Sequence, residues 1–179
     1  MASKNRPSRR TYLNDFKRDA SGRYIYRGRY LAFDGAEKRR KRLLAKLCVL
    51  AFVSVLAVIG AGSLDTAGMD NTFYVLIPYM GEIAFTAALV WATVRLCISG
   101  EPLREYIYKA TVDRLPKLGF ALAISAAVTL ICAGIYLTLN GFGGKAVLCV
   151  TYLLLQIVII FVSFLHIKAL KKARWNSEK

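Results

Sequence analysis

Long apolar runs separated by shorter polar segments dominate the pattern along this chain. Four runs are long enough for a bilayer, whose hydrocarbon core of about 30 Å needs about 20 helical residues. They are Leu43–Leu64, Phe73–Ile98, Leu118–Leu139 and Ala146–Ile167. Short connections make successive helices antiparallel neighbours. We therefore predict an all-α membrane protein with four transmembrane helices in an up-down-up-down bundle.

The polar segments divide the chain into three parts. Residues 1–41 form a basic cytoplasmic N-terminal segment, residues 42–170 the four-helix transmembrane domain, and residues 171–179 a cytoplasmic tail. Between the second and third spans, the stretch "EPLREYIYKATVDRLP" has Leu103, Ile107 and Ala110 at helical spacing. It predicts a short amphipathic helix lying on the membrane surface.

The stretch "SGRYIYRGRYLAF" in the N-terminal segment has the alternation of a β-hairpin. Glycine accepts the positive φ angle that tight hairpin turns need, so the pair Arg27-Gly28 predicts the turn. Tyr26 would then face Arg29, and Ile25 would face Tyr30. A lone hairpin is marginally stable in water. We expect this one to form only on a partner, on the membrane surface or on the bundle's own cytoplasmic end.

The basic residues gather on one side of the four predicted spans. The chain carries 26 Lys and Arg against 11 Asp and Glu, a formal net charge of +15. In the four-span topology, 25 of the 26 lie on the side of the two termini, and only Lys145 lies on the other. Cytoplasmic loops are enriched in Lys and Arg. Both termini are therefore predicted to face the cytoplasm, in a plasma (cytoplasmic) membrane.

The aromatic and basic residues of the N-terminal segment are the predicted docking surface for a partner or for lipid. Interleaved Arg and Tyr also suit single-stranded nucleic acid, but anionic head groups beside this segment explain the same composition, so we expect no nucleic-acid partner. The candidate docking residues are Arg23, Tyr24, Tyr26, Arg27, Arg29, Tyr30, Lys38, Arg39, Arg40, Lys41 and Arg42.

A single carboxylate, Glu82, interrupts the second apolar run. If the helix starts at Phe73, this group lies about 13 Å along it, near the middle of the membrane. If Pro78 opens the helix, as proline at the first turn often does, the group lies near the outer interface instead. An acid at the midplane is a candidate proton site or needs a hydrogen-bond donor. Tyr136, Tyr152 and Gln156 are the candidate partners at matching depth.

Polar residues also form stripes on three spans, which predicts a shared polar seam inside the bundle. The stripes are Tyr79, Glu82, Thr86 and Thr93; Ser125, Thr129, Cys132 and Tyr136; and Cys149, Tyr152, Gln156, Ser163 and His166. They fit either hydrogen bonding between helices or a translocation path, and we favour the first because pumps usually need relays of ionisable groups. His166, at the cytoplasmic end of its span, is expected to anchor the interface.

No arrangement of nucleophile, base and metal ligand is recognisable in the sequence. The segment "GFGGK" lacks the phosphate-loop pattern, there is no Cys-x-x-Cys pair, and the chain has one histidine. We therefore expect no enzyme, no cofactor and no metal. The predicted function is that of an accessory or scaffold subunit of a membrane complex, partnered by other membrane subunits or by copies of itself. The alternative is a small proton- or cation-coupled transporter using Glu82.

Overall fold

The computed structural model describes residues 16–18, 22–26 and 28–178. Four apolar helices of 26 residues each make up most of it, and at 1.5 Å per residue each is about 39 Å long. This length and composition confirm the four predicted spans of a multi-pass membrane protein. The helices are α1 (Glu37–Gly62), α2 (Phe73–Ile98), α4 (Leu115–Asn140) and α5 (Ala146–Lys171).

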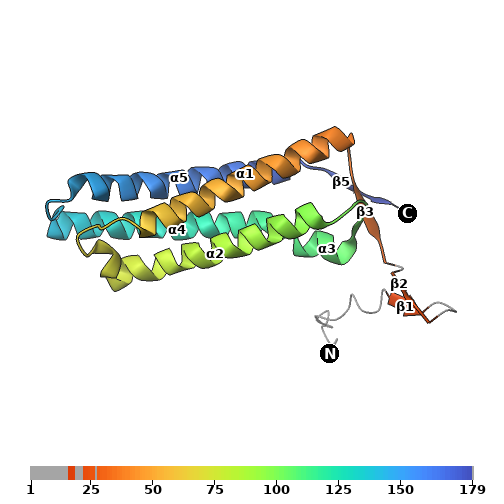
Figure 1. Cartoon of the computed structure of the whole chain (residues 1–179), viewed down its shortest axis with the longest axis horizontal. Helices are drawn as coiled ribbons and strands as arrows, with labels where there is room; N and C mark the ends of the chain where they lie inside the picture. The colour runs from red at the N-terminus through yellow and green to blue at the C-terminus, as the bar shows by residue number, and fades with distance from the viewer. Residues whose placement is uncertain (1–15, 19–21, 27, 179) are drawn as a thin grey trace, which may run out of the picture.

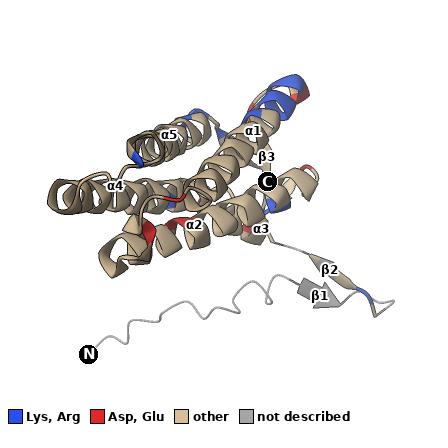
Figure 2. Ribbon diagram, turned by 60° about the vertical axis from the view of Figure 1, so that its left-hand side comes forward, with Lys and Arg blue, Asp and Glu red and all other residues tan. Residues whose placement is uncertain are grey.

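The four helices form a closed bundle with antiparallel neighbours. Helix α1 packs against α2 and α5, and α4 packs against the same two helices (Figure 1). This is the predicted up-down-up-down arrangement. The ends of α1 and α5 that carry the chain termini lie together, at what we call the basic end of the bundle. Lys and Arg residues crowd the first turns of α1 there (Figure 2).

Each helix buries one stripe and exposes large apolar side chains on the opposite side. On α2 the buried stripe advances by three and four residues, through Glu82, Thr86, Leu89, Thr93 and Leu96. Steps of this size keep side chains on one face of a helix. Outward-facing residues include Phe52, Ile77 and Phe161, each more than 60% exposed. A surface this apolar suits hydrocarbon.

Two glycines let neighbouring helices approach closely. A Cβ atom at Gly81 of α2 would lie 2.7 Å from the Ser125 Oγ of α4. One at Gly119 of α4 would lie 3.1 Å from Ile167 of α5. Small residues at such crossings drive packing in membranes, where no hydrophobic effect holds helices together.

A three-stranded antiparallel sheet covers the basic end. Its central strand is β3 (Tyr30–Phe33), flanked by β4 (Leu103–Arg104) and β5 (Trp175–Glu178). Leu103 is fully buried in the bundle's hydrophobic core. The Trp175 ring meets the rings of Phe33 and Tyr108 edge-on. The sheet therefore ties together three chain segments that are far apart in the sequence.

The predicted pairing within the N-terminal hairpin is wrong. Strand β2 (Tyr24–Tyr26) pairs with β1 (Phe16–Arg18), with Phe16 opposite Tyr26, whereas β3 pairs with β4 and β5. Arg27, half of the predicted turn, lies outside the described residues. A two-stranded ribbon alone gains little. Pairing β3 on both edges satisfies more backbone groups and adds the buried Leu103 and the packed Trp175.

The connection between α2 and α4 contains a shorter helix than predicted. Helix α3 (Glu105–Ala110) covers only part of the expected range. Leu103, expected on its membrane-facing side, belongs to β4 and is buried in the protein instead. Ile107 packs against the same core. The apolar residues Leu103 and Ile107 of this loop therefore pack against the bundle rather than against lipid.

An ion pair and a hydrogen bond between side chains order the opposite end of the bundle. Lys145, before α5, donates to the carboxylate of Asp65, which follows α1. The helical turn η2 (Met69–Asn71) follows, and the Thr66 hydroxyl donates to Asp70 Oδ2 at 2.6 Å. Lys145 holds the pKa of Asp65 below its usual value, while burial raises the pKa of Asp70.

Candidate functional site

Glu82 lies deep within α2 and is fully buried. The helix begins at Phe73 and continues through Pro78, so the alternative in which Pro78 opens it is wrong. Glu82 follows nine residues after the start, about 13 Å along the axis. A carboxyl group at this depth has no water to solvate it. Its environment therefore depends on the side chains of the neighbouring helices.

Two neighbouring helices supply hydrogen-bond donors to Glu82. The Thr129 hydroxyl of α4 donates to Glu82 Oε1. With the amide oriented to suit its surroundings, Gln156 Nε2 of α5 donates to Oε2 at 3.1 Å and to Oε1 at 3.2 Å. Both donor residues are fully buried. We call Glu82, Thr129 and Gln156 the Glu82 cluster, which joins α2, α4 and α5 through neutral donors.

Of the three residues predicted to donate a hydrogen bond to Glu82, one does so and two do not. Gln156 is a donor, as expected for a polar residue at that depth. Tyr136 donates instead to the backbone oxygen of Ala67 at 3.2 Å, outside the cluster. The Tyr152 hydroxyl does not bond Glu82 and instead interacts with the amide of Gln156.

Most of the predicted polar seam is buried in the bundle interior, whereas its members Tyr79, Cys132 and Tyr136 are half-buried. Thr86, Thr93, Ser125, Thr129, Cys149, Tyr152, Gln156, Ser163 and His166 are all buried. Thr93 and Ser163 hydroxyls each donate to the carbonyl oxygen four residues earlier, a bond that stays inside one helix. Only the Glu82 cluster joins three helices through side-chain hydrogen bonds among the described residues.

His166 is buried rather than anchored at the interface. Its side chain is 1% exposed, and neither ring nitrogen has a hydrogen-bond partner among the described residues. It lies ten residues after Gln156 on α5, on the same buried stripe. The expectation of an interfacial histidine fails because the stripe of α5 stays inside the bundle up to Leu170.

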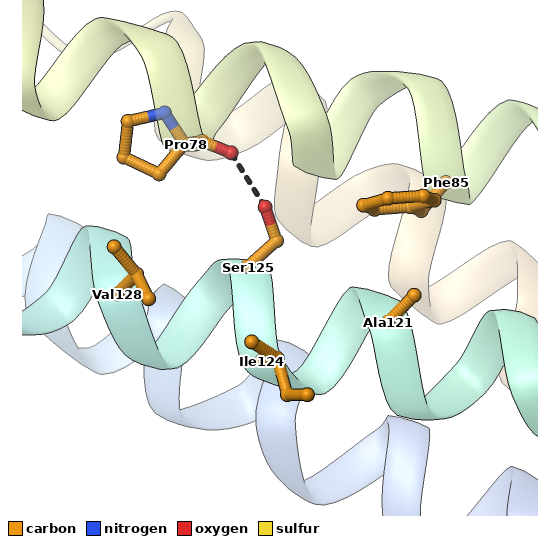
Figure 3. Close-up of a pocket in the computed structure, with 6 residues that line it drawn as sticks. All are labelled: Pro78, Phe85, Ala121, Ile124, Ser125 and Val128. Atoms are coloured by element: carbon orange, nitrogen blue, oxygen red, sulfur yellow. Dashed lines mark hydrogen bonds between the residues drawn. The ribbon is translucent and has the colours of Figure 1, made fainter.

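A shallow apolar pocket of about 340 Å³ lies between α2 and α4 beside the Glu82 cluster. Figure 3 shows the Ser125 hydroxyl pointing to the Pro78 carbonyl, to which it donates at 2.7 Å. The other side chains that line the pocket are apolar: Phe85, Ala121, Ile124 and Val128. The one polar side chain in the lining is therefore already bonded, and the pocket offers no donor to a polar solute.

The basic end presents most of the predicted docking residues to the outside. The exposed ones are Arg23, Tyr24, Arg29, Lys38, Arg39, Lys41 and Arg42. Tyr30 is half-buried. Tyr26 is buried, its ring edge-on to those of Tyr30 and Tyr106, with the Arg104 guanidinium 5.5 Å from its centroid. Arg27 is outside the described residues.

Arg40 serves the interior of the basic end rather than its surface. Its Nε lies 3.2 Å from Glu101 Oε1, and its Nη2 donates to the Ser99 carbonyl at 2.9 Å. The Phe33 amide of β3 donates to the same Glu101 oxygen at 3.3 Å. Arg40 and Glu101 therefore fasten α1, the end of α2 and the sheet to one another. Sequence reasoning placed Arg40 in the docking set together with the neighbouring basic residues 38–42.

Comparisons of the chain with protein-family models, with curated proteins and with solved structures found no match.

Sequence reasoning placed Thr129 in the polar stripe of its helix but did not identify it as a partner of Glu82. Its depth in the membrane could have indicated this pairing. In the antiparallel pair α2 and α4, Glu82 lies nine residues after the start of α2 and Thr129 eleven before the end of α4. Both positions are therefore at similar depth. A threonine in a transmembrane helix usually bonds its own backbone, and the Thr129 hydroxyl oxygen also lies 3.1 Å from the Ser125 carbonyl oxygen, which shares its single hydrogen with Glu82.

Proposed function

We propose that the protein is a non-enzymatic accessory or scaffold subunit of a membrane complex. Its basic end would dock a partner through the aromatic and basic residues of the N-terminal segment. The observation that supports this most is the sheet formed by β3, β4 and β5. This sheet joins three segments that are far apart in the sequence, and its central strand β3 directly follows the exposed Arg29 (Figure 1).

The chemistry of the basic end favours an acidic partner. Arg23, Arg29 and Lys38 are exposed and form no ion pair with any described acidic residue. Charges left unpaired at a rim steer association with a surface of opposite sign. Tyr24 is 67% exposed beside them and offers the aromatic contact that interfaces favour.

The proposed orientation puts the basic end in the cytoplasm of a cell bounded by a plasma (cytoplasmic) membrane. The support is the distribution of 25 of 26 basic residues on the side of the termini. Both termini then face the cytoplasm, where a soluble partner or the cytoplasmic part of another membrane subunit is within reach. Anionic head groups of the same leaflet would hold the basic segment near the surface.

A photo-reactive amino acid at Tyr24 in the full chain tests this proposal in cells. We expect a discrete cross-linked product that weakens several-fold in the variant R23Q/R29Q, because the partner loses the charges that attract it. The same probe at Phe161, on the outer face of α5, is the matched control for collisions within the membrane. The proposal is wrong if position 24 gives no product beyond that control, or if the charge variant leaves the product unchanged.

A second candidate function is proton- or cation-coupled transport through Glu82. The observation that favours it is a fully buried carboxyl group with only neutral hydrogen-bond partners among the described residues. An acid inside a membrane protein is a functional candidate for this reason. We rank it second because Glu82 is closed off on all sides and its donors already satisfy it.

The variants Glu82→Gln and Glu82→Leu separate the two candidates. Gln keeps the size and most hydrogen bonds but removes titration, whereas Leu leaves Gln156 and Thr129 without their acceptor, a loss of about 1–3 kcal/mol. If Glu82 is structural, the Gln variant assembles and functions and the Leu variant is destabilised. If a pH-dependent flux in proteoliposomes disappears in a well-folded Gln variant, Glu82 is a proton site.

A further inference from the structure

The last turns of α2 carry an amphipathic pocket at the basic end. Trp91, Val94, Arg95, Ile98 and Ser99 line a volume of about 280 Å³. Trp91 is 72% exposed and Ile98 80% exposed, so these side chains extend away from the bundle. The pocket therefore has an apolar wall on its outward side and a cationic group, Arg95, at its polar end.

The polar end of the pocket is held in place by contacts within the protein. The Ser99 hydroxyl donates to the Arg95 carbonyl at 2.8 Å, and the Ser99 carbonyl accepts from Arg40 at 2.9 Å. Arg40 is fixed in turn by Glu101. The Arg95 side chain is exposed and forms no ion pair with any described acidic residue. It is thus an available cation on an ordered support.

The depth of this pocket matches the boundary between hydrocarbon and head groups. Arg95 lies in the last turn of α2 and Trp91 one turn before it. Tryptophan is enriched at this boundary, and arginine near a helix end reaches toward the head groups. Basic pockets on the cytoplasmic side of transmembrane helices bind anionic lipid head groups.

We propose that this pocket binds one anionic phospholipid. The phosphate group would bond the Arg95 guanidinium, and an acyl chain would lie along Trp91 and Ile98. Free phosphate would leave the apolar wall uncovered, and a second copy of the chain would bring a second basic end against the first. Only an anionic amphiphile satisfies both parts of the pocket. This inference does not rest on the docking of an acidic partner.

The tryptophan in the pocket provides its own probe. The chain has two tryptophans, so Trp175→Phe leaves Trp91 as the single tryptophan, which is excited selectively at wavelengths that tyrosine does not absorb. The full chain is placed in bilayer nanodiscs that contain brominated phosphatidylglycerol or brominated phosphatidylcholine, whose bromine atoms quench indole fluorescence on contact. We expect about a fivefold preference of the pocket for the anionic lipid, the factor that one basic residue typically contributes.

Three variants in the same background decide the origin of that preference. Arg95→Gln should reduce the preference to about one, Arg95→Lys should retain most of it, and Lys46→Gln should leave it unchanged. Lys46 is the matched control, since it is exposed on α1 two residues before Cys48, which contacts Cys97 next to the pocket. Equal quenching by both lipids, or a preference that survives Arg95→Gln, overturns the proposal. So does loss of the preference when inorganic phosphate is added, because phosphate alone would then be the ligand.

Discussion

Gly81 determines how closely α2 and α4 pack. Its missing side chain leaves room for Ser125, whose hydroxyl bonds the Pro78 carbonyl on the neighbouring helix. A methyl group there would lie 2.7 Å from the Ser125 Oγ. Either the hydroxyl turns away and leaves Pro78, or the helices separate. Both outcomes weaken the contact beside the Glu82 cluster.

Gly81→Ala should therefore destabilise the bundle by about 1–3 kcal/mol, the usual cost of overpacking. Denaturant unfolding of the full chain in mixed micelles measures the change. The matched control is Gly134→Ala on α4, where an added Cβ would meet nothing within 4 Å. The double variant Gly81→Ala with Ser125→Ala should recover part of the loss. Equal stability of the Gly81 and Gly134 variants would contradict this account.

The contact between α1 and α2 can be tested at the level of these two elements. Cys48 of α1 and Cys97 of α2 bring their Sγ atoms to 3.3 Å near the basic end, and both side chains are exposed. Two thiols this close need only a small movement to form a bond when an oxidant removes two electrons and two protons.

Mild copper-phenanthroline treatment of the full chain in membranes should therefore remove two of its four thiols, without forming dimers. The remaining thiols are counted by the gel shift after reaction with maleimide-polyethylene glycol. The Cys97→Ser variant should lose no thiols to a bond within the chain, because Cys48 then lacks its partner. If the wild-type chain keeps all four thiols, or forms only dimers, the packing of α1 on α2 described above is wrong.

The ion pair between Asp65 and Lys145 joins the two loops opposite the basic end, and it makes their contact pH-dependent. Lys145 lowers the pKa of Asp65 below its ordinary value of 3.8 through a hydrogen bond and its charge. The pair therefore stabilises the contact above that ordinary value, and this stabilisation is lost as the pH falls through the lowered pKa. The pKa of Asp70 shifts in the opposite direction, because burial raises it.

Energy transfer between labels at positions 64 and 142 should report this contact in the full chain. We expect transfer to stay constant at neutral pH and to fall once the pH is below about 3.8. Asp65→Asn should lower the transfer at neutral pH and abolish the acid response, since the carboxylate is gone. An acid response that persists in Asp65→Asn would assign it to Asp70 or to another group.

The whole molecule has two chemically different ends, and this asymmetry predicts its orientation. Single cysteines introduced at positions 65–70 and 141–144 of a cysteine-free chain should react with an impermeant maleimide added outside intact cells. A cysteine at position 105 should react only after the membrane is permeabilised. Labelling of position 105 in intact cells would reverse the proposed topology.

The span positions were predictable because they depend on local composition. A bilayer-spanning helix satisfies its backbone hydrogen bonds within itself, so a run of apolar residues is sufficient to specify it. The sequence predicted Phe73–Ile98 with the bounds that α2 has. The polar seam followed in the same way, since Glu82, Thr86 and Thr93 share one face by helical periodicity alone.

The partners of individual groups depended on tertiary structure. Strand pairing and side-chain bonds join residues far apart in the sequence, and several pairings satisfy the same local pattern. The "YIYRGRYLAF" stretch permits a hairpin, but the buried Leu103 and the packed Trp175 make β3 the centre of another sheet. Likewise the depth of Glu82 could be counted along one helix. The choice of Thr129 and Gln156 over Tyr136 and Tyr152 depended on how α4 and α5 rotate about their axes, and only packing against the other helices fixes that rotation.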